Sequence, residues 1–142
     1  MFAVGSGASI GILTSAVDRR IKILDTLDPW GDWPQWMATS PLIPEDERAE
    51  YVKPEFLKKV SDLDPVEWLP KVQAERLRLQ DAIFEPTTPA PSKEKLRAAA
   101  PPNATVRIYT TPAELDAVVK NHAELDWIKH ELQFLPVLGS RK

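Results

Sequence analysis

The residues best suited to chemistry lie near the start of the chain, at positions 7 to 11. They read Gly-Ala-Ser-Ile-Gly and fit the pattern G-x-S-x-G, in which a tight strand-to-helix turn exposes a serine hydroxyl for nucleophilic attack. The apolar residues 2 to 4 precede the pattern and are typical of the end of a buried strand. The pattern therefore predicts that Ser9 stands exposed at the turn as a nucleophile.

Other interpretations of the same glycine-rich stretch compete with this one. A phosphate-binding loop ending in Gly-Lys-Ser or Gly-Lys-Thr is excluded, because the first lysine of the chain is Lys22. The dinucleotide-binding pattern G-x-G-x-x-G is weakened by Ile10, which stands where its last glycine is required. A glycine and serine loop that caps a helix and has no chemistry stays open as an alternative.

The composition is typical of one soluble domain. Of the 142 residues, 43% are hydrophobic and 27% are charged, which is enough for a buried core, and the net charge of -3 provides no basic surface for nucleic acid. No apolar run is long enough to span a membrane and no signal peptide is recognisable, which favours a cytoplasmic location. The chain has no cysteine and only 2 histidines, so we expect neither a metal site nor a cofactor.

Hydrophobic periodicity predicts the elements that must position Ser9. Apolar residues at helical spacing predict a helix over residues 9 to 17, and the aliphatic residues 21 to 27 predict a strand that ends at Asp28-Pro29. A strand, a helix and a second strand in this order form a βαβ unit, in which the two strands are parallel.

These residues carry a resemblance to a known family. GSGASIG, with AVDRRIKILDTLDPWGDW after it, resembles the nucleophile elbow, helix and next strand of the α/β-hydrolases, of the serine esterase and prolyl-oligopeptidase-like kind. The resemblance implies an α/β fold with part of a parallel sheet, about three to four strands, flanking helices and a helical lid insertion. It divides one domain, 1–142, into a strand-elbow-helix-strand segment (1–27), a lid-like insertion (28–76) and the last strands with a C-terminal helix (77–142).

The lid-like insertion begins with closely spaced tryptophans, including Trp30 and Trp33. Each buries a large apolar area and presents one N–H donor. In the resemblance they provide an apolar wall that binds the acyl or aromatic group of a substrate. The alternative is that they anchor a lid helix to its own domain.

The triad acid of the family follows the strand after the lid. Residues 77 to 84 predict that strand, and Glu85 occupies the loop position after it. Asp81 is a second candidate, although a residue inside the strand points its carboxylate away from the loop. Glu85 is alternatively a loop carboxylate without a catalytic role.

The family places its catalytic histidine in the loop after the last strand, which we predict over residues 106 to 109. Here that loop is only Thr110-Thr111. The sequence from Thr111 to Glu114 is a capping box with proline at the first helical position, so a helix begins at once. One apolar stripe predicts that this helix continues to Leu135.

The candidate base is His122, which lies about ten residues inside that predicted helix, roughly 15 Å along its axis. We therefore expect its ring not to reach Ser9. His130 lies on another face of the helix and is a poorer candidate. One oxyanion donor would be the backbone N–H of Ile10, while the family's second donor comes from a loop after the third strand, which has no counterpart here.

Two functions from different classes follow. In the preferred one, the chain is the C-terminal half of an α/β-hydrolase fold that is catalytically impaired or non-catalytic, because Met1 falls inside a strand that should be central. In the alternative, it is a serine hydrolase of esters or peptides that uses Ser9, Glu85 and His122. We also expect self-association through the exposed sheet edge, and no nucleic-acid or membrane partner.

Overall fold

The computed structural model describes residues 1–121 and 125–133 of the chain. Four parallel strands form one sheet in the order β1-β2-β3-β4. Their bounds are Phe2–Val4 (β1), Ile23–Leu27 (β2), Arg76–Ala82 (β3) and Thr105–Tyr109 (β4). The prediction of an α/β fold with a parallel sheet of about three to four strands is confirmed.

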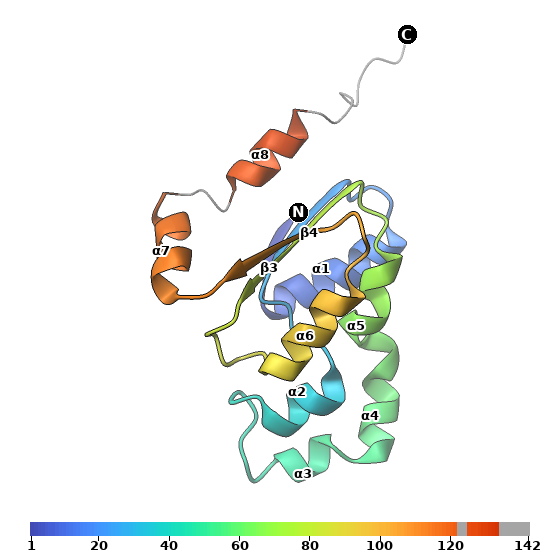
Figure 1. Ribbon diagram of the computed structural model, residues 1–142. Helices are drawn as coiled ribbons and strands as arrows, with labels where there is room; N and C mark the ends of the chain where they lie inside the picture. Colours follow the sequence, from blue (N-terminus) through green and yellow to red (C-terminus); the bar gives the residue numbers. More distant parts are fainter. Residues whose placement is uncertain (122–124, 134–142) are drawn as a thin grey trace.

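Helices connect the strands and cover the sheet (Figure 1). The α-helices are α1 (Ser6–Val17), α2 (Trp33–Thr39), α3 (Arg48–Tyr51), α4 (Pro54–Val60), α5 (Pro65–Trp68), α6 (Ala90–Ala99), α7 (Pro112–Lys120) and α8 (Asp126–Leu132). Two 3₁₀ turns, η1 (Ser61–Leu63) and η2 (Leu69–Lys71), follow α4 and α5.

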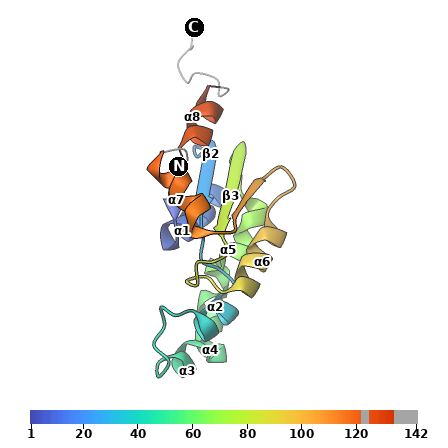
Figure 2. The same cartoon turned by 60° about the vertical axis from the view of Figure 1, so that its left-hand side comes forward.

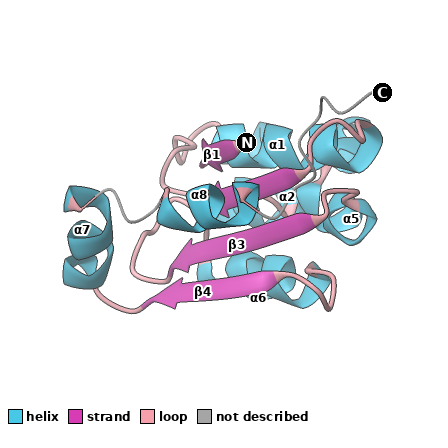
Figure 3. Cartoon of the chain, turned by 90° about the horizontal axis from the view of Figure 1, so that it is seen from above, coloured by secondary structure: helices cyan, strands magenta, loops and turns pink. Residues whose placement is uncertain are grey.

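The two faces of the sheet carry different side chains. Alternate residues of a strand point to opposite faces, so Leu24 and its register partner Leu77 lie on one face, while Asp25 and its partner Arg78 lie on the other. We call them the apolar face and the polar face. Figure 3 shows α8 in front of the strands and α1 and α6 beyond them.

The apolar face holds the main core. Its buried cluster packs β2 and β3 against α1 and the segment around η2, and this burial of aliphatic surface is the main favourable contribution to folding. The members are Ile12, Leu24, Leu69, Ala74, Leu77 and Leu79. Gly11 permits the close approach of α1, because a Cβ there would come within 3.2 Å of Leu24 Cδ1.

The polar face is built on a hydrogen-bonded network. Arg78 donates to both carboxylate oxygens of Asp25, at 2.9 and 2.7 Å. Gln80 Nε2 donates to Asp25 Oδ1 at 3.0 Å, and the Tyr109 hydroxyl donates to Gln80 Oε1 at 2.6 Å. The Arg78 guanidinium lies 4.8 Å from the centre of the Trp127 ring of α8. Burial raises the pKa of Asp25, although Arg78 and Gln80 oppose this shift.

The segment between β2 and β3 forms a group of short helices at one end of the sheet. Figures 1 and 2 show α2, α3 and α4 below the strands, with α5 leading back along the sheet. Asp64 caps α5: its side chain accepts from the Val66 N–H at 3.0 Å, and Pro65 is the first helical residue.

The end of the chain differs from its prediction. The capping box at Thr111 is confirmed, with Glu114 bonded back to the cap. The single helix predicted up to Leu135 is wrong, because α7 ends at Lys120 and a separate helix, α8, covers Asp126–Leu132. Both helices keep apolar residues at helical spacing, so the stripe alone did not reveal the interruption.

Candidate functional site

The carboxyl ends of parallel strands meet at one edge of a sheet, where α/β proteins place their ligands. At this edge, the turn that follows β1 is made by Gly5. Its backbone has φ 56° and ψ -125°, and its N–H donates to Leu27 O at 2.9 Å. This left-handed conformation favours glycine, and a Cβ at this position would lie 3.3 Å from Trp30 Nε1. The sharp strand-to-helix turn is therefore present, but the residue on it has no side chain.

Ser9 lies elsewhere. It is the fourth residue of α1 and only 5% exposed. Its hydroxyl donates to Trp30 O at 2.7 Å and accepts from the Trp30 N–H at 2.9 Å. The prediction that Ser9 stands exposed at the turn is therefore wrong: β1 ends at Val4 and α1 begins after Gly5, four residues too early for the pattern G-x-S-x-G.

Ile10, the predicted oxyanion donor, lies inside the same helix. Its side chain is 66% exposed. Ile10 is the fifth residue of α1, and the geometry of an α-helix uses the N–H of such a residue for the carbonyl four positions earlier. The first-turn N–H groups that an α-helix leaves unbonded belong instead to residues that precede Ser9.

The tryptophans connect this turn to the insertion. Trp30 stacks on Trp36 with ring centroids 4.9 Å apart, and Trp33 meets Trp36 edge-on at 5.8 Å. Trp36 is 7% exposed, while Trp30 and Trp33 are half-buried. Because Ser9 holds the backbone of Trp30 at both its N–H and its carbonyl, the stack ties α2 to α1. A substrate-binding role for Trp30 and Trp33 stays a prediction.

A buried ion cluster, which sequence reasoning missed, lies at the ends of β2 and β3. Lys93 of α6 is 4% exposed, and its ammonium lies 3.0 Å from Asp28 Oδ1 and 3.2 Å from Asp81 Oδ1. Asp28 also accepts from the Ala82 N–H at 2.8 Å, and Arg97 pairs with Asp81. Burial raises the pKa of Asp28, more than Lys93 and the Ala82 N–H lower it.

The signal for this cluster was weak because its members come from distant parts of the sequence. Asp28, with φ 47°, directly follows β2. A polar residue before a proline is typical of a turn, so the sequence did not indicate an ion pair there. Asp81, the second candidate for the triad acid, is bound to Lys93 and Arg97 inside this cluster.

Glu85 lies in the loop after β3, as expected, but its carboxylate is turned into that loop. Glu85 Oε1 accepts from the Thr87 hydroxyl at 2.7 Å and from the Thr87 N–H at 3.3 Å. Thr87 in turn accepts a hydrogen bond from the Ser40 hydroxyl, at 2.7 Å. The Glu85 carboxylate therefore fixes the loop on which it stands, and no described contact joins it to Ser9.

The loop after β4 contains Thr110 and Thr111 and then enters α7. Glu114 Oε2 accepts from the Thr110 N–H at 2.6 Å. The hydrogen bonds from the backbone N–H and the hydroxyl of Thr110 lower the pKa of Glu114, and the backbone bond has the largest effect. His122 lies outside the described residues, so its distance from Ser9 stays a prediction. His130 of α8 lines a cavity with Arg76 and Thr105, the first residues of β3 and β4, at the opposite end of the sheet.

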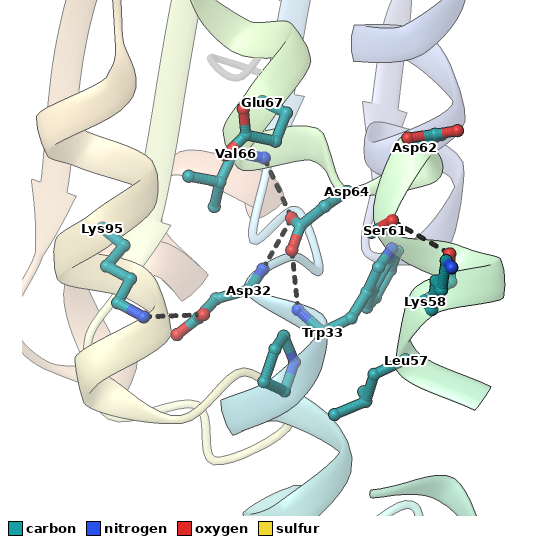
Figure 4. A pocket seen from close by; sticks show the side chains of 11 residues that line it. Asp32, Trp33, Leu57, Lys58, Ser61, Asp62, Asp64, Val66, Glu67 and Lys95 are labelled. Atoms are coloured by element: carbon teal, nitrogen blue, oxygen red, sulfur yellow. Dashed lines mark hydrogen bonds and ion pairs between the residues drawn. The ribbon is translucent and has the colours of Figure 1, made fainter. Parts of the chain in front are cut away.

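A cleft of about 640 Å³ lies between the insertion helices and α6 (Figure 4). Its walls include Trp33 and Leu57, and its floor is fixed by Asp64, whose carboxylate accepts from the N–H groups of Asp32 and Trp33, each at 2.8 Å. Lys95 closes one side through its ion pair with Asp32, at 2.8 Å. Ser9 and Glu85 do not line it.

Within residues 1–121 and 125–133, no group of three or more histidine, aspartate or glutamate side chains is arranged to hold a metal ion. None of the helices within these same ranges has the length and apolar character needed to cross a bilayer.

The fold and the strand-end geometry define an α/β chain that matches part of the α/β-hydrolase fold. No protein-family model matches the sequence, and no curated protein matches it either. Among solved structures, Pyrococcus horikoshii acylaminoacyl peptidase is similar with a TM-score of 0.60 and 14% identity, over 78% of this chain and 19% of that one. Acetyl xylan esterase from Paenibacillus sp. R4 is similar with a TM-score of 0.58 and 15% identity, over 83% of this chain and 42% of that one.

The esterase domain of a Rhodothermus marinus protein is also similar, with a TM-score of 0.52 and 12% identity, over 75% of this chain and 49% of that one. The chain thus spans less than half the length of each of these three structures. At these identities the similarity is one of fold. It agrees with the α/β-hydrolase-like fold that the sequence implies.

Proposed function

We propose that this chain is a catalytically inactive α/β-hydrolase-like module, one domain over residues 1–142, that acts as an interaction module in the cytoplasm. The observation that carries the proposal is Gly5. A nucleophile elbow places its serine on the strained turn between strand and helix, and here the residue with that backbone conformation is a glycine, which has no side chain to act as a nucleophile.

The hydroxyl of Ser9 is a poor substitute. It is almost fully buried and bonded to both backbone groups of Trp30. To attack a substrate it would have to give up these bonds, each of which stabilises the fold by about 0.5–1.5 kcal/mol. The alternative function, a serine hydrolase with Ser9 as nucleophile and Glu85 as acid, needs this rearrangement and also a turn of the Glu85 carboxylate out of its bonds with Thr87.

Labelling with a fluorophosphonate probe tests the proposal. We expect the wild-type chain to be labelled no more than its Ser9→Ala variant, and to hydrolyse p-nitrophenyl acetate no faster. Ser9→Ala should also lower the free energy of unfolding by about 1–2 kcal/mol, because the Trp30 backbone loses its partner. Stoichiometric labelling that disappears in Ser9→Ala would contradict the proposal and establish the alternative, with an ester or a peptide as substrate.

A second variant tests whether the missing side chain at position 5 alone explains the proposed inactivity. Gly5→Ser puts a hydroxyl on the turn, and we expect it to remain unlabelled, because the loop after β4 supplies threonines where a hydrolase supplies its base. Labelling of Gly5→Ser, with none of the wild-type chain, would show that the missing side chain alone explains the inactivity.

A further inference from the structure

The first element pair, β1 and α1, has no charged side chain. The first charged side chain of the sequence is Asp18, directly after α1. The Met1 amino group donates to Ile23 O at 2.7 Å, inside the sheet. The surface formed by β1 and α1 therefore carries no charged side chain.

That surface is also apolar and exposed. α1 packs on the sheet through Gly11, and on its neighbouring side Ser15 O accepts from the Gln73 N–H at 3.0 Å. The side of α1 left over carries Ile10 and Val17, each 66% exposed, and Gly7, beside which a Cβ would meet open space. Figure 3 shows β1 at the rim of the sheet next to α1.

The backbone of β1 leaves one edge unpaired within the described structure. Met1 O accepts from Asp25 N and Gly5 N donates to Leu27 O, each at 2.9 Å, so these residues face β2. Alternate residues of a strand direct their N–H and C=O groups to opposite sides. Phe2 and Val4 therefore direct theirs to the free edge, and the Val4 side chain is 52% exposed.

We propose that this edge is the interface of a symmetric dimer, in which β1 pairs with β1 of a second copy in antiparallel orientation. A two-fold axis beside Ala3 pairs Phe2 with the partner's Val4 and Val4 with the partner's Phe2. The outward N–H and C=O groups of each copy then form hydrogen bonds with those of the other. The pairing joins two four-stranded sheets into one continuous sheet.

The helices fit the same arrangement. α1 lies over both β1 and β2, since a Cβ on Gly11 would meet Ala3 and Leu24. With strands about 4.8 Å apart, the two α1 helices of such a dimer lie about 10 Å apart, which is a normal packing distance for helices. Ile10 and Gly7 of each copy then face the other copy, and no like charges oppose one another.

The other edge of the sheet does not favour self-pairing. β4 also exposes apolar side chains, Val106 at 43% and Ile108 at 45%. Its middle residue, however, is Arg107. Antiparallel pairing of two β4 strands about their centre would place Arg107 directly opposite Arg107 of the second copy, and such like-charge pairs are destabilising. Charged residues on an edge strand are a known device against edge-to-edge association.

Sedimentation equilibrium of the full chain tests the proposal. We expect the wild type at twice the 16.0 kDa mass of one chain. Ile10→Glu should raise the dimer dissociation constant about 100-fold, because each interface would bury two unpaired carboxylates. The matched control is Val119→Glu, which replaces a 46% exposed valine of α7 and should leave the dimer intact.

A backbone variant keeps the test independent of side-chain charge. Val4→Pro removes an N–H that β2 does not use, so it should leave the far-UV circular dichroism and the urea midpoint of the monomer unchanged while abolishing the dimer. A chain that is monomeric at every concentration would overturn the proposal. A dimer that survives Ile10→Glu and Val4→Pro but is lost in Val106→Glu would overturn it in favour of β4.

Discussion

On the apolar face, Leu24, Leu77 and Leu79 are at most 2% exposed, whereas on the polar face the same two strands carry Asp25 and Arg78. The apolar face gains its free energy by removing aliphatic surface from water. The polar face buries a carboxylate and a guanidinium, whose lost hydration is recovered only because the pair is bidentate and further bonded. One face of the sheet is thus stabilised by burial of apolar side chains, and the other contains an ion pair that is favourable only while both partners are present.

The largest expected effect comes from removing one member of that pair. Arg78→Met leaves the Asp25 carboxylate buried without its counter-ion, and we expect a loss of about 4 kcal/mol in the free energy of unfolding at pH 7. Urea denaturation followed by circular dichroism measures it. Arg20→Met, which removes a guanidinium 90% exposed to solvent, is the control. Equal losses in Arg78→Met and Arg20→Met would mean that the Arg78 ion pair contributes no more to stability than an exposed one.

A truncation on the apolar face should cost less. Leu79→Ala is expected to lower the free energy of unfolding by about 3 kcal/mol through lost burial and the cavity left behind. Leu63→Ala, at a leucine that is 56% exposed, is the matched control and should change it by less than about 1 kcal/mol. The Leu79→Ala loss should be the same in low and high salt; a salt-dependent loss would mean that the faces are not distinct.

A double variant separates the pair from its members. Asp25→Leu combined with Arg78→Met removes both charges and keeps similar volumes, so we expect it to cost about 1 kcal/mol or less, well below Arg78→Met alone. The same urea titration measures it. Additive losses would show that Asp25 and Arg78 stabilise the fold through separate contacts.

The smallest effect concerns pH. The pKa values of Asp25 and Asp28 are raised by burial, so the folded chain binds protons more readily than the unfolded chain above the usual carboxyl pKa of 3.8. Their contribution to stability therefore falls as pH rises through that window. Asp18 acts in the opposite sense, because Arg20 lowers its pKa to about 2 and its contribution is lost as pH falls towards that value.

Thermal denaturation at pH 4.5 and pH 7 measures this dependence. Asp25→Asn cannot titrate at position 25, and we expect a smaller difference between the two pH values than in the wild type. Asp46→Asn, at an exposed position, is the control. An unchanged difference in Asp25→Asn would show that the buried carboxylate does not contribute.

Much of the fold was predictable because its signals are local. The aliphatic run ending at Leu27 and the cap at Thr111 each need only neighbouring residues to be recognised. The site was not, because its geometry is set by distant contacts. The pattern around Ser9 matched a motif, yet the position of the turn follows from where β1 ends, at Val4. The pairing of Lys93 with Asp28 depends on how α6 docks on the sheet, which no local pattern encodes.

The three backbone N–H bonds of Asp64 have a consequence for motion. They come from Asp32 and Trp33 at the start of α2 and from Val66 at the start of α5. The loss of any one of these hydrogen bonds removes a donor from the same carboxylate, so we expect α2 and α5 to unfold locally together and not separately. Their amide hydrogens should exchange with deuterium at one common rate, and the width of the cleft that they frame should hold constant between openings.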